Sequence, residues 1–160
     1  MTIGKMCNRV TVTIQRQATA EDAARLMRSQ HVGDVVVVDP ADTRRPVGII
    51  TDRDIAINIV AQGLAPSLTP VGSVMSAPVF TVRDDDGLVS ALDKMSKRGV
   101  RRAPVVDRTG HLVGLVSVDD LVPLLARELS RIGALIQRDQ AAEIQKTDDS
   151  FRDESVHAHA

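Results

Sequence analysis

Hydrophobic residues recur along this chain with two alternating periods. Three apolar residues alternate with polar ones and predict a β-strand, Val10, Val12 and Ile14. A stripe at spacing i, i+3, i+4, i+7 then predicts an amphipathic helix, with Ala20, Ala23, Ala24 and Met27 on one face. The β-branched run 35–38 is typical of a buried strand, and a polar turn separates it from a return strand at 47–50. Thr51 then opens a second helix.

The same order of elements occurs a second time, 68 positions later. Residues 3–39 align with 71–107 without a gap, and after a turn that is shorter by two residues the match resumes at an offset of 66. Each copy is predicted to fold as β-α-β-β-α, so the chain is α+β, with two similar halves related by a pseudo-two-fold axis. The cleft between such halves is a natural place for a ligand.

Glycine and proline residues, together with the apolar pattern, divide the chain into four segments. Gly63, Pro66 and Pro70 mark a linker, which gives a first repeat at 1–68 and a second at 69–126. An apolar stripe outlasts the second repeat and predicts a C-terminal helical extension at 127–146, through Leu121, Leu125, Leu129, Ile132 and Ile136. Pro123 predicts a late start or a kink in this helix. The polar segment 147–160 is expected to be a disordered tail.

Composition narrows the class of protein. The 160 residues carry a net charge of -1, which provides no general attraction to nucleic acid or anionic lipid. Cys7 is the one cysteine, so an internal disulfide is excluded, and the first residues contain no apolar signal core. We therefore expect a cytoplasmic protein. Phe80 and Phe151 are the only aromatic residues, which argues against single-strand binding by base stacking.

The second copy reads Pro-Val-Val-Asp at Pro104 to Asp107 and Val-Gly-Leu-Val-Ser-Val-Asp-Asp-Leu at Val113 to Leu121. With Val35 to Asp39 and Val47 to Ile55 in the first copy, the chain resembles a pair of CBS (cystathionine β-synthase) domains over residues 3–126, most closely the stand-alone bacterial type. The resemblance implies a regulatory sensor that binds an adenosine nucleotide between the repeats, with AMP, ADP, ATP or S-adenosylmethionine as the candidate ligands.

The resemblance also implies a set of ligand-binding residues. Asp54 and Asp120 match the family's ribose-binding aspartate, since a carboxylate accepts charge-assisted hydrogen bonds from vicinal hydroxyls. Hydroxyls at helix starts and guanidinium groups suit phosphate. Adenine would lie among valines, near Val35. The full set carried over is Thr13, Thr51, Arg53, Asp54, Thr81, Arg101, Arg102, Ala103, Ser117 and Asp120. Gly33 and Asp34 replace the arginine pair in the first copy, so the two clefts are not expected to be equivalent.

Plainer interpretations stand beside these. Thr51-x-x-Asp54 and Ser117-x-x-Asp120 are also helix capping boxes, and the arginine pair also fits a solvated surface. The acidic run 84–86 fits a helix start better than a metal site.

No enzyme motif is present, and we expect no catalysis. The alternative function is a structural or protein-interaction module with empty clefts that presents its C-terminal helix to an effector protein. For the sensor we expect a homodimer. Nucleic-acid binding through Arg98, Arg101 and Arg102 is a third, weaker possibility.

Overall fold

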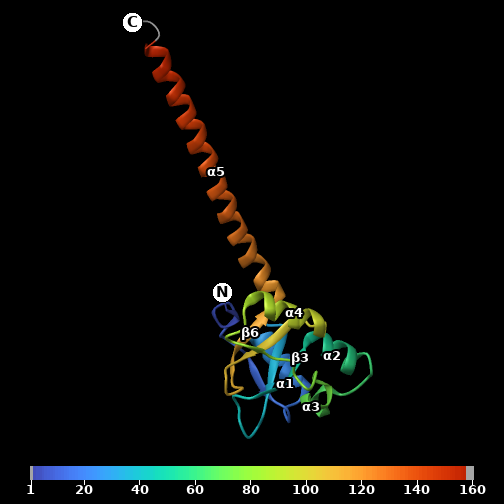
Figure 1. The fold of residues 1–160 in the computed structure, drawn as a ribbon. Helices are drawn as coiled ribbons and strands as arrows, with labels where there is room; N and C mark the ends of the chain where they lie inside the picture. The colour runs from blue at the N-terminus through green and yellow to red at the C-terminus, as the bar shows by residue number, and fades with distance from the viewer. Residues whose placement is uncertain (1, 158–160) are drawn as a thin grey trace. The chain divides into compact units, whose positions relative to one another are not determined.

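The computed structural model describes residues 2–157, and it describes side chains up to 144 except that of residue 142. The chain divides into two compact units, residues 1–118 and residues 119–160 (Figure 1). The first unit contains both copies of the repeat. The second unit is the greater part of one long helix, and the two units are described separately below.

Two three-stranded sheets form the first unit, with strand orders β1-β2-β3 and β4-β5-β6. In each sheet the first strand is parallel and the third antiparallel to the central strand. The first copy comprises η1 (Ile3–Lys5), β1 (Thr13–Gln15), α1 (Ala20–Gln30), β2 (Asp34–Val38), β3 (Pro46–Thr51), α2 (Asp52–Ile55), η2 (Ala56–Val60) and η3 (Pro66–Leu68). The second comprises α3 (Val71–Val74), β4 (Val82–Arg83), α4 (Leu88–Arg98), β5 (Arg102–Val106) and β6 (Leu112–Ser117). The predicted α+β class with tandem repeats is confirmed.

The central strands are buried, as their β-branched composition predicts. Val35, Val36 and Val37 are fully buried, and β2 and β5 shift register against β3 and β6 at the same place in each copy. The first strands are shorter than the alternating pattern predicts. Val10 lies before β1 and is 83% exposed, so its alternation reflects an extended segment outside the sheet.

The starts of the two long helices differ. Thr19 and Asp22 form a capping box at α1, with the Thr19 side chain accepting from the Asp22 backbone N–H. The residue at the start of α4 is Gly87, which makes no side-chain cap, so Asp86 does not cap this helix. Asp86 instead accepts a hydrogen bond from the Arg83 backbone N–H and pairs with Lys94 at 2.7 Å.

The segment in front of each copy packs against the other copy. The Gly4 N–H donates to the Asp84 carbonyl at 2.9 Å, and the equivalent Gly72 N–H donates to the Arg16 carbonyl at 2.8 Å. Val71, at the start of α3, belongs to the buried cluster of the first copy, with Val35, Ile50 and other residues. Each copy therefore completes its hydrophobic core with a segment from the other, and the two copies form one unit.

The turns between the second and third strands of the copies also meet. The Leu112 N–H donates to the Arg44 carbonyl at 2.7 Å, and His111 Nε2 lies 3.1 Å from Asp42 Oδ2. A hydrogen bond from the Arg44 backbone N–H is the main cause that lowers the pKa of Asp42, and His111 adds to it. These contacts join the two sheets at their turns.

The second unit is formed by α5, which spans Val118–His157. The first residue of this helix, Val118, is also the last residue of the first unit. Helix α5 contains Pro123 in its second turn, so the late start, one of the two expectations for this residue, is wrong. At this position proline lacks an N–H that would bond to the carbonyl four residues earlier, which is the physical reason for the other expectation, a kink. The helix also covers residues 147–157, where a disordered tail is expected. The stretch 134–157 contains neither glycine nor proline, so no residue breaks the helix. Residues 158–160 lie outside the described part.

Within the described residues, no helix combines the length and the apolar character needed to cross a membrane. The apolar residues of α5 are interrupted by charged ones in every turn or two, such as Arg127, Arg131 and Arg138.

We predict that Gly114→Ala destabilises the protein more than Gly48→Ala, although the two positions are equivalent in the repeat. A Cβ at Gly114 would lie 2.7 Å from the Asn8 carbonyl oxygen, whereas one at Gly48 would meet the flexible side chain of Met75. Backbone cannot move aside as a methionine can, so Gly114→Ala should cost about 1–3 kcal/mol and Gly48→Ala less. Urea unfolding of both variants measures the difference. Equal stability of the two variants would contradict the exchanged packing.

Candidate functional site

An ion pair joins the two copies at equivalent positions. Asp34 begins β2 and Arg102 begins β5, and their aligned positions differ by the repeat offset. The Asp34 Oδ2 atom lies 2.9 Å from Arg102 Nε, with the Asp34 side chain only 12% exposed. Because equivalent residues meet each other, the pair lies close to the pseudo-two-fold axis. In this pair the Asp34 carboxylate contacts the guanidinium of its own counterpart in the second copy.

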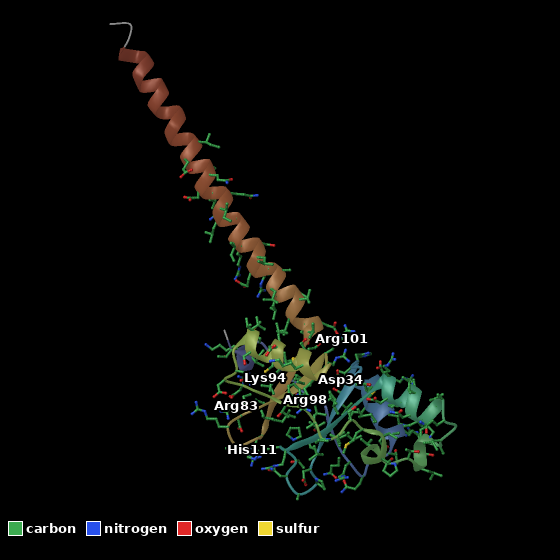
Figure 2. All side chains as sticks on the ribbon, turned by 45° about the vertical axis from the view of Figure 1, so that its right-hand side comes forward. Asp34, Arg83, Lys94, Arg98, Arg101 and His111 are labelled. Atoms are coloured by element: carbon green, nitrogen blue, oxygen red, sulfur yellow. The ribbon has the colours of Figure 1, made fainter. Side chains whose placement is uncertain are left out.

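A cavity of about 190 Å³ opens beside Arg102. Its wall is mostly apolar, and its polar members are Ser76 and two arginines. Arg98, from the last position of α4, lies over the ring of Phe80 with its guanidinium carbon 5.9 Å from the ring centroid. Figure 2 labels Arg98 together with Asp34. The lining residues are Ile49, Ser76, Pro78, Val79, Phe80, Arg98, Val100, Arg102 and Pro104.

The cavity draws its wall from both copies because of the exchanged segments. Ile49 of β3 forms an isolated bridge with Ser76, and both line the cavity. The chain then continues from Ser76 to Phe80 along the cavity before it enters β4. Packing of this segment against the first copy thus creates the space, and β5 closes the other side through Arg102 and Pro104.

Thr51 is the last residue of β3 and Ser117 is the last residue of β6, and both lie next to the ion pair. Strand register sets Thr51 opposite Asp34 and Ser117 opposite Arg102. Thr51 forms a full capping box with Asp54: Oδ2 of Asp54 accepts from the Thr51 N–H at 2.9 Å and from its hydroxyl at 2.8 Å. The capping interpretation is therefore correct for Thr51. Oδ2 is the oxygen in both contacts, which assigns Oδ1 to any further partner.

The other predicted ligand-binding residues are found at several places in the fold. Arg102 lines the cavity itself, Thr81 follows the lining residue Phe80, and Ala103 is a fully buried neighbour of Arg102. Arg101 is exposed, and its carbonyl accepts from the Val118 N–H. The others are Thr13 on β1, Arg53 in the first turn of α2, and Asp120, which is the third residue of α5 and belongs to the second unit.

Arg98, Phe80 and Ser76 are lining residues that the sequence-based set omits. A usable indication was present for Arg98, because its equivalent in the first copy is Gln30. Arg98 and Arg102 are both basic positions in the second copy whose counterparts, Gln30 and Asp34, are not basic. Other positions, such as Arg16 and Asp84, also differ in charge between the copies, so a charge difference indicates the site only together with the lining of the cavity.

The acidic run at 84–86 contributes to ion pairs. Side-chain hydrogen bonds from the Arg83 guanidinium lower the pKa of Asp85 to about 2. No cluster of three or more potential metal ligands occurs among the residues described, and α4 begins after the run, with no acidic residue in its first turn.

Comparison with known proteins agrees with this architecture. The family model of the CBS domain matches residues 3–61 and 71–127. An uncharacterized protein of Methanopyrus kandleri is 37% identical over 122 residues, which cover 76% of this chain and 61% of that protein. The chain thus spans less than two thirds of that relative.

Two solved structures are similar over most of their length. One is a CBS domain protein from Pyrobaculum aerophilum complexed with AMP, with a TM-score of 0.69, 30% identity, and coverage of 76% of this chain and 90% of that one. The other is the CBS domain pair of protein MJ0100 in complex with 5′-methylthioadenosine and S-adenosyl-L-methionine, with a TM-score of 0.70, 25% identity, and coverage of 80% and 98%.

We predict that Thr51→Ala lowers the free energy of unfolding by about 1 kcal/mol, the usual contribution of a helix cap. Thr19→Ala is the matched control, because Thr19 makes the same capping box at α1, away from the cavity. Chemical unfolding of both variants should give similar losses. A loss for Thr19→Ala with none for Thr51→Ala would contradict a capping role for Thr51.

Proposed function

Because the chain belongs to the CBS domain family and carries two copies of the domain in tandem, we propose that it is a regulatory module that binds an adenosine nucleotide. The cavity lined by Arg98 and Arg102 is the proposed site. The two similar structures described above hold AMP in one case and S-adenosyl-L-methionine in the other. They support adenosine-type ligands as a class for this chain.

The observation that carries the proposal is the placement of two guanidinium groups at one small apolar cavity. Ligand pockets for small molecules usually measure roughly 300–1,000 Å³, so about 190 Å³ suits one ring system with the rest of the ligand outside. Val79, Phe80 and Val100 offer apolar contacts to a base. Arg98 and Arg102 offer hydrogen bonds to a phosphate, for which the guanidinium fork is well suited.

The asymmetry of the repeat selects this cavity over its counterpart in the first copy. Gln30 and Asp34 stand there in place of the two arginines. The Asp34 carboxylate contacts Arg102 at this cavity as well, so the difference lies in Arg98, whose guanidinium offers a phosphate stronger contacts than the amide of Gln30. We therefore assign the phosphate to the cavity of the second copy.

The capping residues have a second role in this proposal. Asp54 uses Oδ2 for its cap, and Oδ1 is the oxygen that would accept a ribose hydroxyl. Thr51, Ser117 and Asp120, together with Thr13, Thr81, Arg53, Arg101 and Ala103, remain predicted ligand contacts. Binding of a ligand that contacts both copies would favour one arrangement of them, which is the basis of a regulatory response.

We predict that wild-type protein binds at least one of AMP, ADP, ATP and S-adenosylmethionine, and that Arg98→Ala weakens the binding by about 10-fold or more through loss of a charge-assisted hydrogen bond. Isothermal titration calorimetry measures the affinity. Gln30→Ala, the equivalent position in the first copy, is the matched control and should leave the affinity unchanged.

The absence of heat for all four ligands, with protein that is folded by circular dichroism, would contradict the proposal. A purified sample offers an independent check, since the chain contains no tryptophan or tyrosine. Absorbance near 260 nm that is released by denaturation and filtration would identify a copurified nucleotide.

A second candidate function, protein interaction through α5, is favoured by the exposed apolar residues of that helix. Leu129, Leu135 and Ile144 are 64–69% exposed, and Val122, Ile132 and Ile136 are 54–59% exposed. Apolar surface of this kind usually marks an interaction site. We propose that a second copy of the chain covers it in a homodimer, with an effector protein as the alternative occupant.

We predict that Leu129→Ser combined with Ile132→Ser shifts the chain from dimer to monomer in sedimentation velocity, because both side chains are removed from the apolar stripe. Arg131→Ser is the control, since Arg131 pairs with Glu128 along the helix rather than extending the stripe. A wild-type chain that sediments as a monomer at all concentrations would contradict the homodimer.

A further inference from the structure

A chain of hydrogen bonds runs from the turn between β5 and β6 to the turn between β2 and β3. The Thr109 hydroxyl donates to Asp107 Oδ1 at 2.6 Å. His111 Nδ1 lies 2.7 Å from the same hydroxyl oxygen, and His111 Nε2 lies 3.1 Å from Asp42 Oδ2. Asp42 belongs to the first copy and the other three residues to the second, where Figure 2 labels His111. The imidazole therefore bridges the two copies.

The donors and acceptors of this chain match only when His111 is protonated. An ionised carboxylate only accepts, and a hydroxyl has one hydrogen to donate. Because the Thr109 hydrogen is directed to Asp107, the hydroxyl oxygen must accept from His111 Nδ1, and Asp42 must accept from Nε2. A neutral imidazole has a single N–H. It either turns a nitrogen lone pair toward the Asp42 carboxylate or takes the Thr109 hydrogen away from Asp107, so it makes one hydrogen bond fewer.

The two carboxylates near the imidazole favour the same protonated form. A hydrogen bond from the Arg44 backbone N–H is the main cause that lowers the pKa of Asp42. A hydrogen bond from the Thr109 hydroxyl is the main cause that lowers the pKa of Asp107, and the charge of His111 adds to the lowering in both cases. Histidine changes its charge between about pH 5 and 8. Both carboxylates are therefore ionised throughout the range in which a histidine gains or loses its proton.

The other charged residues of the two turns make contacts elsewhere. Arg44 Nε lies 3.8 Å from Asp42 Oδ1, which is not the oxygen that faces His111. Arg108 Nε lies 3.5 Å from Asp85 Oδ2. Asp39 accepts from a backbone N–H within its own turn, and Arg45 is exposed. The contact at Asp42 Oδ2 is therefore made by the imidazole rather than by an arginine of either turn.

We propose that His111 is a proton-sensitive link between the two copies, which protonation tightens and loss of the proton loosens. This inference does not depend on nucleotide binding. Because the protonated form makes the extra hydrogen bond and pairs with a charged carboxylate, the link is complete at the acidic end of the histidine range and weakens as the pH rises. The Leu112 N–H can report on the link, since it donates to the Arg44 carbonyl at 2.7 Å directly beside His111.

The test measures amide hydrogen exchange of Leu112 by nuclear magnetic resonance at about pH 5.5 and about pH 8. Each rate is expressed as a protection factor, which removes the pH dependence of exchange in an unfolded chain. In wild-type protein the Leu112 protection should fall by about 10-fold over this range, the size of one charge-assisted hydrogen bond. The internal reference is the Val36 N–H, which donates to the Val12 carbonyl within the first copy and should change less.

Three variants assign the effect. His111→Gln and Asp42→Asn should each abolish the fall in Leu112 protection, because one removes the titrating group and the other its charged partner. Asparagine at position 42 keeps an oxygen for the Arg44 backbone N–H, so the turn itself is preserved. His31→Asn is the matched control, since His31 is an exposed histidine at the end of α1 with a φ of 54°, which asparagine tolerates. This variant should keep the wild-type fall.

Wild-type protein alone can overturn the inference, so the test does not depend on the folding of a variant. A Leu112 protection factor that changes no more than that of Val36 would do so. A fall that persists in His111→Gln or in Asp42→Asn, or one that disappears in His31→Asn, would also overturn it. None of these results bears on the proposed function, which the nucleotide titrations decide separately.

Discussion

The exchange of leading segments between the two copies is the constraint on which the structure of the first unit depends. Each copy has a three-stranded sheet and a helix, and its core is completed by a short segment from the other copy. Val71 shows this directly, because it lies in the second copy by sequence and in the core of the first by packing. Glycines at the contact points, such as Gly4 and Gly72, allow backbone to approach backbone. Neither copy can therefore bury its core alone.

The same exchange creates the candidate site. The chain between α3 and β4 passes along the first copy before it joins the second sheet, and its residues from Ser76 to Phe80 line the cavity. The site is thus a consequence of how the copies are connected. A change of the packing between the copies would alter the cavity. Under the proposed function, a bound ligand would in turn favour one packing of the copies.

Sequence differences between the copies determine which charged residues lie at the site. In a perfect duplication the two clefts would be the same, and equivalent residues at the axis would carry the same charge. Here Arg98 and Arg102 align with Gln30 and Asp34, so both cations that line the cavity come from the second copy. The pair of Asp34 with Arg102 uses this divergence to stabilise the junction, in a partly buried place where an unpaired charge would be costly.

Much of the fold follows from sequence, because the repeat, the buried β-branched runs and the helical stripes all report local patterns. The cap formed by Thr19 was predictable on the same ground. The residues that line the cavity were less predictable from the sequence. Phe80 and Arg98 are distant in sequence and meet through the exchange, which has no local pattern. Residues 147–157 are helical, and their polar composition indicates solubility rather than backbone conformation.

The central claim is that an adenosine nucleotide binds beside Phe80, and nuclear magnetic resonance tests it most directly. The chain has two phenylalanines, so labelling this residue type gives a spectrum in which a Phe80→Leu variant assigns the Phe80 ring. Titration of labelled protein with the nucleotide that binds most tightly should shift the Phe80 ring signals saturably, with the dissociation constant found by calorimetry. Saturable binding by calorimetry with unchanged Phe80 signals would contradict the account.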